Sequence, residues 1–99
     1  MNAKPIMETP PPWTFLSNHG HVLVCIVRDP NVRVREIAQA VGLTERAVQR
    51  ILSELEEASV IVRTRQGRRT HYEVNERLPL RHPIEAENSV GELVRAVRS

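Results

Sequence analysis

Residues 34–55, VREIAQAVGLTERAVQRILSEL, place apolar side chains at helical spacing on both sides of a glycine. The apolar positions are Ile37, Ala38, Val41, Leu43, Val48, Ile51, Leu52 and Leu55. This pattern predicts two short helices that meet at a tight turn. Gly42 can adopt the positive φ that such a turn requires, and the small side chain of Ala38 lets the second helix cross the first closely.

The first helix of this pair is expected from residue 34 or 35 to Val41, and the second from Thr44 to about Ala58. The Thr44 hydroxyl can accept a hydrogen bond from an otherwise unpaired amide of the first turn, and the charge of Glu45 suits the positive end of the helix dipole. Burial of the apolar positions leaves a polar outer face, which consists of Glu45, Arg46, Gln49, Arg50 and Ser53.

After this helix the period changes from helical to alternating, which predicts a β-hairpin. Val60, Val62 and Thr64 are expected to face one way, and Ile61, Arg63 and Arg65 the other. Alternation resumes after residues 66–68, the expected tip, with Thr70, Tyr72 and Val74 opposite Arg69, His71 and Glu73. Residues 32–34 are expected to add a short strand to this sheet.

The spacing of residues 34–55 resembles the helix-turn-helix of DNA-binding transcriptional regulators. The small residue, turn glycine and buried aliphatic of that motif coincide with Ala38, Gly42 and Val48, and its other core positions with Ile37, Val41 and Ile51. The following sequence, ASVIVRTRQGRRTHYEVN, resembles the wing of the winged-helix subclass, as in the MarR-like and ArsR-like regulators. The resemblance implies a mainly α fold with a small β-wing: a three-helix core, a β-hairpin and an extra C-terminal helix.

A further helix is expected to start at Ser17 or Asn18 and to run to about Arg28. Pro30 disfavours helical geometry at Asp29 and so gives a natural stop. The run VLVCIV at residues 22–27 is rich in β-branched residues and on propensity alone could be a strand, but the winged-helix resemblance implies a helix. A helix so apolar on all sides is expected to be buried on more than one of them.

Three segments follow from these assignments: an N-terminal arm (1–15), a winged helix-turn-helix DNA-binding domain (16–76), and a connector with a C-terminal dimerisation helix (77–99). Ser89 and Glu92 match the capping box Ser-x-x-Glu, which predicts the last helix. This helix has an apolar stripe and little of its own chain to pack on. Because resembling regulators often pair their first and last helices, the resemblance implies a homodimer interface that contains Leu93, Val94 and Val97.

Two of the three aromatic residues of the chain, Trp13 and Phe15, lie in one short segment after the proline-rich start. One interpretation is that they cover the core of the protein or of a dimer partner. The other is that they line a ligand pocket.

The composition is that of one small domain, whose 99 residues bury only about 60–65% of the surface that the unfolded chain exposes. A single cysteine, Cys25, permits no internal disulfide and fits a reducing compartment. No signal peptide or membrane span is recognisable, so a cytoplasmic protein is expected. No metal signature, phosphate loop or catalytic pair is present, and the sequence predicts neither enzymatic activity nor a cofactor.

The major groove of DNA accepts one α-helix and displays a different donor and acceptor pattern for each base pair. Arginine can bind guanine O6 and N7 together, and glutamine can bind adenine N6 and N7. The resemblance therefore implies DNA contacts on the second motif helix by Thr44, Arg46, Gln49, Arg50 and Ser53, of which Thr44 and Ser53 suit phosphates better than bases.

Positive charge gathers in the expected wing, where residues 60–75 hold four arginines and one glutamate. Arg65, Arg68 and Arg69 can neutralise phosphates or enter the minor groove. The alternative is a charged edge that prevents sheet-to-sheet aggregation.

The sequence thus predicts a sequence-specific, double-stranded DNA-binding transcriptional regulator that acts as a homodimeric repressor; whether it has a small-molecule effector is left open. Two alternatives remain. The chain could be a winged-helix protein-interaction module, or an antitoxin-like accessory factor that needs a partner to bind DNA.

Overall fold

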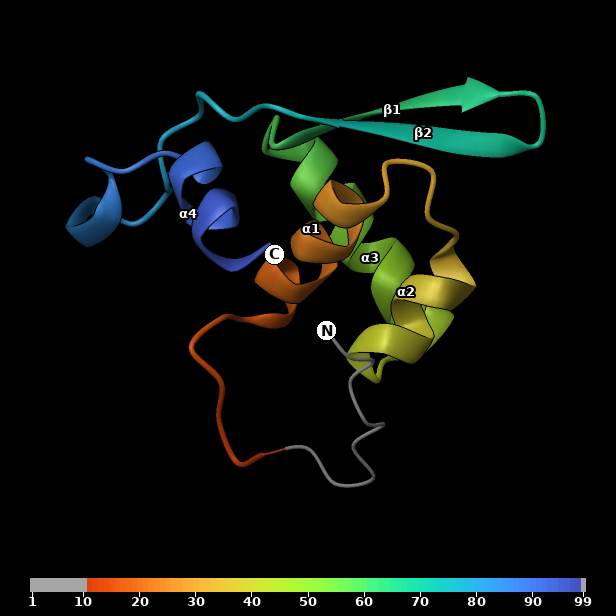
Figure 1. Ribbon diagram of the computed structural model, residues 1–99, viewed down its shortest axis with the longest axis horizontal. Coiled ribbons are helices and arrows are strands. Elements are labelled where there is room, and N and C mark those ends of the chain that lie inside the picture. Colours follow the sequence, from red (N-terminus) through yellow and green to blue (C-terminus); the bar gives the residue numbers. More distant parts are fainter. Residues whose placement is uncertain (1–10, 99) are drawn as a thin grey trace.

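The computed structural model describes residues 11–98. The expected N-terminal arm lies mostly outside the described residues. Along the chain, the elements are α1 (Asn18–Arg28), α2 (Val34–Val41), α3 (Glu45–Glu57), β1 (Ile61–Gln66), β2 (Arg69–Val74), the 3-10 helix η1 (Pro83–Glu85) and α4 (Val90–Val97). Figure 1 shows α1 between α4 on one side and the α2–α3 pair on the other, with the hairpin extending along one edge. The predicted mainly α fold with a β-wing is confirmed.

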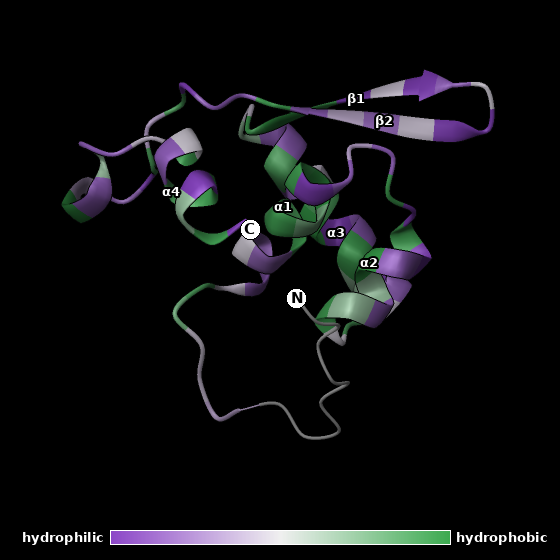
Figure 2. Cartoon of the chain, in the orientation of Figure 1, coloured by the Kyte–Doolittle hydropathy of each residue, from purple (hydrophilic) through white to green (hydrophobic). Residues whose placement is uncertain are grey.

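The core forms where α1, α2 and α3 pack pairwise against one another. Each of these helices turns its apolar stripe inward, as the hydropathy colours in Figure 2 show. The largest side chains that are completely enclosed are Ile26, Ile37, Ile51, Leu52, Ile61, Val22, Val48 and Val94. The run at residues 22–27 is therefore a buried helix, because tertiary packing outweighs the β propensity of its residues.

The turn between α2 and α3 has the predicted geometry. Gly42 has φ +89°, and the amides of Gly42 and Leu43 both donate to the Ala38 carbonyl, at 2.8 and 3.0 Å. The Thr44 hydroxyl then accepts from the Ala47 amide at 3.0 Å and caps α3. These bonds satisfy backbone groups that helix ends otherwise leave unpaired, so they fix where α3 begins.

The expected strand at residues 32–34 is wrong. The Val32 amide closes a turn onto the Asp29 carbonyl, and Arg33 is already the N-cap of α2, with its amide donating to Glu36 Oε1 at 2.8 Å. Because these bonds occupy the amides of residues 32 and 33, the segment cannot form the hydrogen-bond ladder of a third strand. A single backbone bond, from the Tyr72 amide to the Pro30 carbonyl (2.8 Å), joins the loop to the hairpin.

The two strands of the hairpin are antiparallel and pair from Ile61 with Val74 to Gln66 with Arg69. The expected grouping of Val60 with Val62 is wrong: Val60 and Ile61 are both buried, whereas Val62 is 54% exposed. Val60 belongs to the turn after α3, where its amide donates to the Leu55 carbonyl, and regular alternation begins only at Ile61.

Helix α4 has the predicted capping box, in which the Glu92 amide donates to Ser89 Oγ at 3.1 Å and the Ser89 amide to Glu92 Oε1 at 2.8 Å. The expectation that this helix finds little of its own chain to pack on is wrong. It packs on α1, and Val94, 1% exposed, fills the chain's own core instead of lying at a free surface. Leu93 is partly buried and Val97 is exposed. None of the helices within residues 11–98 is long and apolar enough to cross a membrane.

Candidate nucleic-acid interface

The outward face of α3 carries a polar strip at helical spacing. Arg46, Gln49, Arg50 and Ser53 are all exposed, and Thr44 precedes them at the cap. The opposite face of the helix is buried, because Val48, Ile51, Leu52 and Leu55 lie in the core. The structure therefore brings four of the five sequence-predicted residues, Arg46, Gln49, Arg50 and Ser53, together on one accessible side, while the Thr44 hydroxyl is used by the cap.

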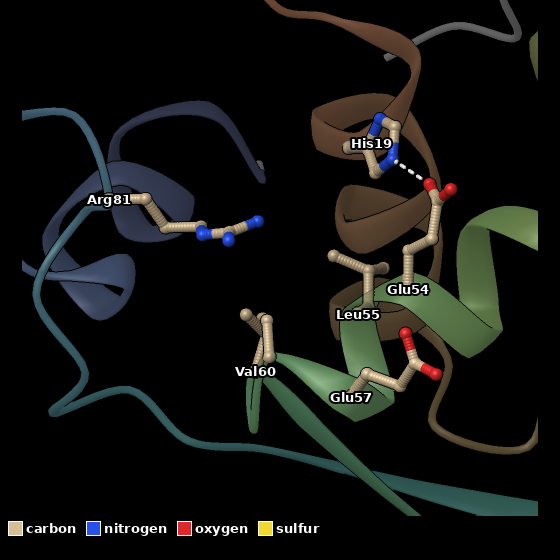
Figure 3. A pocket seen from close by; sticks show the side chains of 7 residues that line it. His19, Glu54, Leu55, Glu57, Val60 and Arg81 are labelled. Atoms are coloured by element: carbon tan, nitrogen blue, oxygen red, sulfur yellow. Dashed lines mark hydrogen bonds and ion pairs between the residues drawn. The ribbon is translucent and has the colours of Figure 1, made fainter.

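Arg50 is held by a neighbour on the same helix. Its Nη1 lies 3.3 Å from Glu54 Oε2 and 3.4 Å from Glu54 Oε1. Glu54 Oε1 also accepts a 2.7 Å hydrogen bond from His19 Nε2 at the start of α1 (Figure 3). The hydrogen bond from His19, followed by the charge of Arg50, lowers the pKa of Glu54 below its usual value, so this carboxylate stays charged at neutral pH.

A pocket of about 550 Å³ opens beside this group. Figure 3 shows Arg81 of the connector reaching across it toward α1 and α3. Apolar and charged groups line it together: His19, Glu54, Leu55, Glu57, Ala58, Val60 and Arg81.

The three predicted arginines of the wing have different surroundings. Arg68 lies exposed in the two-residue turn, beside Gly67 with φ +64°. Arg65 Nε donates to the Gly67 carbonyl at 3.0 Å, which curls its side chain toward the tip. Arg69 Nη2 donates to the Asn31 carbonyl at 2.7 Å, so one edge of its guanidinium is already occupied by the protein.

The base of the wing is docked on the loop between α1 and α2. Besides the Arg69 bond, His71 Nδ1 donates to Asn31 Oδ1 at 3.0 Å, and the Tyr72 amide donates to the Pro30 carbonyl. We call these three bonds the wing clamp. They fix the direction in which the hairpin leaves the helical core.

A basic cleft of about 320 Å³ lies beside the wing clamp, lined by Asn31, Val32, Arg33, Val34, Arg68, Arg69, Thr70 and Tyr72. Sequence reasoning missed Arg33, which the fold places with the two wing arginines. Its signal was present: Arg33 and Arg35 flank the start of α2, where the helix dipole disfavours positive charge. Helix stability alone therefore does not account for this pair.

Arg63 does not belong to the accessible basic surface, because it binds Glu56 near the end of α3. Its Nη2 and Nε lie 2.7 and 3.1 Å from Glu56 Oε1. The hydrogen bond from Arg63 lowers the pKa of Glu56. This ion pair ties β1 to α3 and so helps to orient the wing.

Trp13 and Phe15 lie outside the core. They are 67% and 92% exposed, and their rings meet edge to face with centroids 5.1 Å apart. The interpretation that they cover the chain's own core is wrong, because the core is closed by Val22 and its neighbours without them. The alternatives of a partner surface and a ligand contact remain.

Cys25 is partly buried, and burial raises the pKa of its thiol above the usual value. Such a thiol is a weak nucleophile at neutral pH. No group of three or more His, Cys, Asp or Glu side chains in the described part of the chain could hold a metal ion.

Comparison with known proteins identifies the fold. Residues 17–62, from the cap of α1 to the start of the wing, match the family model described as winged helix-turn-helix DNA-binding. The chain has a winged helix-turn-helix fold. Within it, α2 and α3 are the motif, and the β1–β2 hairpin is the wing.

The crystal structure of MepR, a transcription regulator of the Staphylococcus aureus multidrug efflux pump MepA, has a similar fold. The match covers 82% of this chain, with a TM-score of 0.52 and 20% sequence identity. The chain spans 56% of the MepR chain. No curated protein shows significant sequence similarity to it.

Proposed function

We propose that the chain is a sequence-specific, double-stranded DNA-binding transcriptional regulator. The observation that carries this proposal is the exposed strip of Arg46, Gln49 and Arg50 on the motif's second helix, within a fold whose family model is described as DNA-binding. A helix of this diameter fits the major groove, and these three side chains are the types that read guanine and adenine there.

The order of charge along α3 supports entry by its N-terminal half. Apart from Glu45 in the first turn, Arg46 and Arg50 lie in the first half of the helix, and Glu54, Glu56 and Glu57 lie in the second half. A merely solvated helix is more stable with the reverse order, because the dipole favours acidic residues first and basic residues last. With the first half of α3 in the groove, the acidic end points away from the phosphates.

The wing supplies contacts that do not depend on sequence. Arg68 at the tip and Arg33 beside the basic cleft are free to meet phosphates or the minor groove, and Arg65 and Arg69 add charge nearby. Each phosphate that such a residue neutralises steepens the fall of log K with log[salt] by about 0.9.

We further propose a homodimer that represses transcription by blocking polymerase in the cytoplasm. Leu93 and Val97 on α4 keep apolar surface outside the core, and α4 packs on α1 of the same chain. These two helices therefore offer one joint surface on which a second copy could pack. Val94 takes no part in this interface, because it is buried within its own chain.

A second candidate function is favoured by the exposed pair of Trp13 and Phe15. Two aromatic rings on a surface are typical of protein-protein contacts. A winged-helix interaction module, or an accessory factor that needs a protein partner to bind DNA, would use them. The charged strip on α3 has no role in the interaction module, which is why we rank DNA binding first.

Selection of bound sequences from a random duplex pool tests the proposal. A dimeric regulator is expected to enrich an inverted repeat with half-sites about one helical turn apart. Enrichment of a single half-site would contradict the proposed homodimer but would still support sequence-specific DNA binding. A pool without any enriched sequence would refute the proposal in favour of the interaction module.

A further inference from the structure

We propose that Glu54, itself held by His19, is a positioning residue that fixes Arg50 for reading one base pair. The inference rests on the proposed function, since it assumes that α3 enters the major groove. It concerns a group of three side chains from two elements: His19 at the start of α1, and Arg50 and Glu54 on α3.

His19 and Arg50 bind the carboxylate of Glu54 differently. Oε1 accepts a short bond from His19 at 2.7 Å, and Arg50 Nη1 lies across both oxygens, 3.4 Å from Oε1 and 3.3 Å from Oε2. An ordinary exposed pair four residues apart on a helix is weak, because both side chains must give up rotamer freedom to form it. The bond to His19 removes that freedom from Glu54 in advance, so Arg50 meets a carboxylate that is already oriented.

The contact engages only one corner of the Arg50 guanidinium. The hydrogen bonds of Arg50 to Glu54 use Nη1, which leaves the edge formed by Nε and Nη2 as a two-donor fork. A guanine presents O6 and N7 as a matching pair of acceptors. With a side-chain exposure of 62%, Arg50 remains accessible to a base while its direction is restricted.

Restricting Arg50 before binding sharpens specificity. An arginine that is free to move can also bind phosphate oxygens or a neighbouring base, and ordering it on the correct base costs entropy. The held arginine loses less entropy at the right base pair and reaches wrong acceptors less easily. His19 therefore influences base reading although it lies on α1, outside the helix-turn-helix motif.

The test compares Glu54→Gln with Glu57→Gln, using the duplex selected by the full chain and variants of it changed at one base pair. Both substitutions remove one negative charge from the second half of α3, and within residues 11–98 Glu57 makes no ion pair. Both variants are expected to bind all DNA more tightly. Only Glu54→Gln is expected to lose preference, by about tenfold, at the single base pair that Arg50 reads.

A double-mutant cycle separates positioning from a general effect. In an Arg50→Ala background, Glu54→Gln is expected to change no base preference, because the group that it orients is gone. If Glu54→Gln behaves like Glu57→Gln, or if its effect persists undiminished without Arg50, the inference is overturned. A full chain that prefers no sequence would instead refute the proposed function.

His19 gives a second, independent variant on another element. His19→Leu removes the donor to Glu54 and is expected to weaken preference at the same base pair, whereas His19→Gln keeps an N–H donor and should retain it. Equal preference in both variants would overturn the assignment of His19. Thermal melting of each variant confirms that the compared chains are folded.

Discussion

Arg50 and Arg68 present the same guanidinium group in two different settings. Arg50 projects from a rigid helix and is held by Glu54, whereas Arg68 lies exposed in a two-residue turn. A base-reading side chain needs a fixed direction, and a phosphate-binding side chain needs only charge. The structure therefore assigns different expected effects to their removal.

Arg50→Ala should relax preference at one base pair by roughly 5- to 150-fold, the range of one good bidentate contact, and leave the other positions unchanged. Arg68→Ala should weaken binding to all sequences alike and reduce the slope of log K against log[salt] by about 0.9. Titrations of specific and random duplexes at several salt concentrations measure both effects. Equal losses on both duplexes for both variants would contradict the division between a reading helix and a positioning wing.

At Gly42 the backbone conformation alone explains the need for glycine. An added Cβ would meet nothing within 4 Å, but φ is +89°, a conformation that is strained for residues with a Cβ. Gly42→Ala should therefore lower the free energy of unfolding by about 1–2 kcal/mol, and Gly42→Asn by less, because asparagine tolerates this region better. Urea unfolding followed by circular dichroism measures both, and equal losses would contradict the backbone explanation.

At the scale of elements, the wing clamp decides how the hairpin is presented. Arg69 was expected to contact DNA, yet its Nη2 binds the Asn31 carbonyl, and His71 binds the side chain of the same residue. Such contacts hold β2 against the α1–α2 loop. A two-stranded hairpin is only marginally stable by itself, so these bonds should matter for its order.

Arg69→Ala should loosen the wing, since it removes one of the three bonds of the clamp. Amide hydrogen exchange in β1 and β2 should become faster than in the unchanged chain, while exchange in α2 and α3 stays the same. Arg68→Ala is the matched control, because it removes the same charge from the neighbouring position without touching the clamp. Identical exchange in the two variants would show that Arg69 does not hold the wing.

The elements that depend on local chemistry were predictable from sequence. The caps at Ser17, Thr44 and Ser89 and the turn at Gly42 lie where their residue types require. Errors arose where distant contacts decide. No local signal shows that α4 folds back on α1 and buries Val94. The strand expected at residues 32–34 is a different kind of error, because the turn there is local: the Val32 amide donates to the Asp29 carbonyl, and Asp29-Pro30-Asn31 is a turn-forming sequence.

The candidate site was predictable to a similar degree. The α3 residues share a face because of helical periodicity alone, so sequence sufficed to group Arg46, Gln49 and Arg50. The pairing of Glu54 with His19 joins residues 35 positions apart and required the fold. For the same reason, sequence gave no indication that Arg33 lies beside the wing arginines.

At the scale of the whole molecule, stability should depend on pH on both sides of neutrality. Hydrogen bonds lower the pKa of Glu54, Glu56 and Glu92 below the ordinary 4.5, so their contribution is present above pH 4.5 and is lost as the pH falls through the folded-state values. Burial raises the pKa of Cys25 and Tyr72, so the fold should also weaken as the pH rises above 9, the ordinary pKa of the thiol.

The free energy of unfolding, measured by urea titration between about pH 3 and about pH 10, checks this dependence. Glu92→Gln should make the free energy of unfolding depend less on pH at the acid end. The Ser89 amide lowers the pKa of Glu92, and the glutamine that replaces it does not titrate. Glu87→Gln is the control, since this glutamate is exposed on the connector. An acid slope unchanged in Glu92→Gln would contradict the assignment to the capping box.

The proposed regulatory function requires that the outer face of α3 enters the major groove. Dimethyl sulfate footprinting on the selected duplex tests it directly, because guanine N7 lies in the major groove and adenine N3 in the minor groove. We predict that the bound chain protects guanine N7 within the selected site and that Arg50→Ala restores methylation at one guanine. Protection confined to adenine N3, or unprotected guanines throughout the bound site, would contradict it.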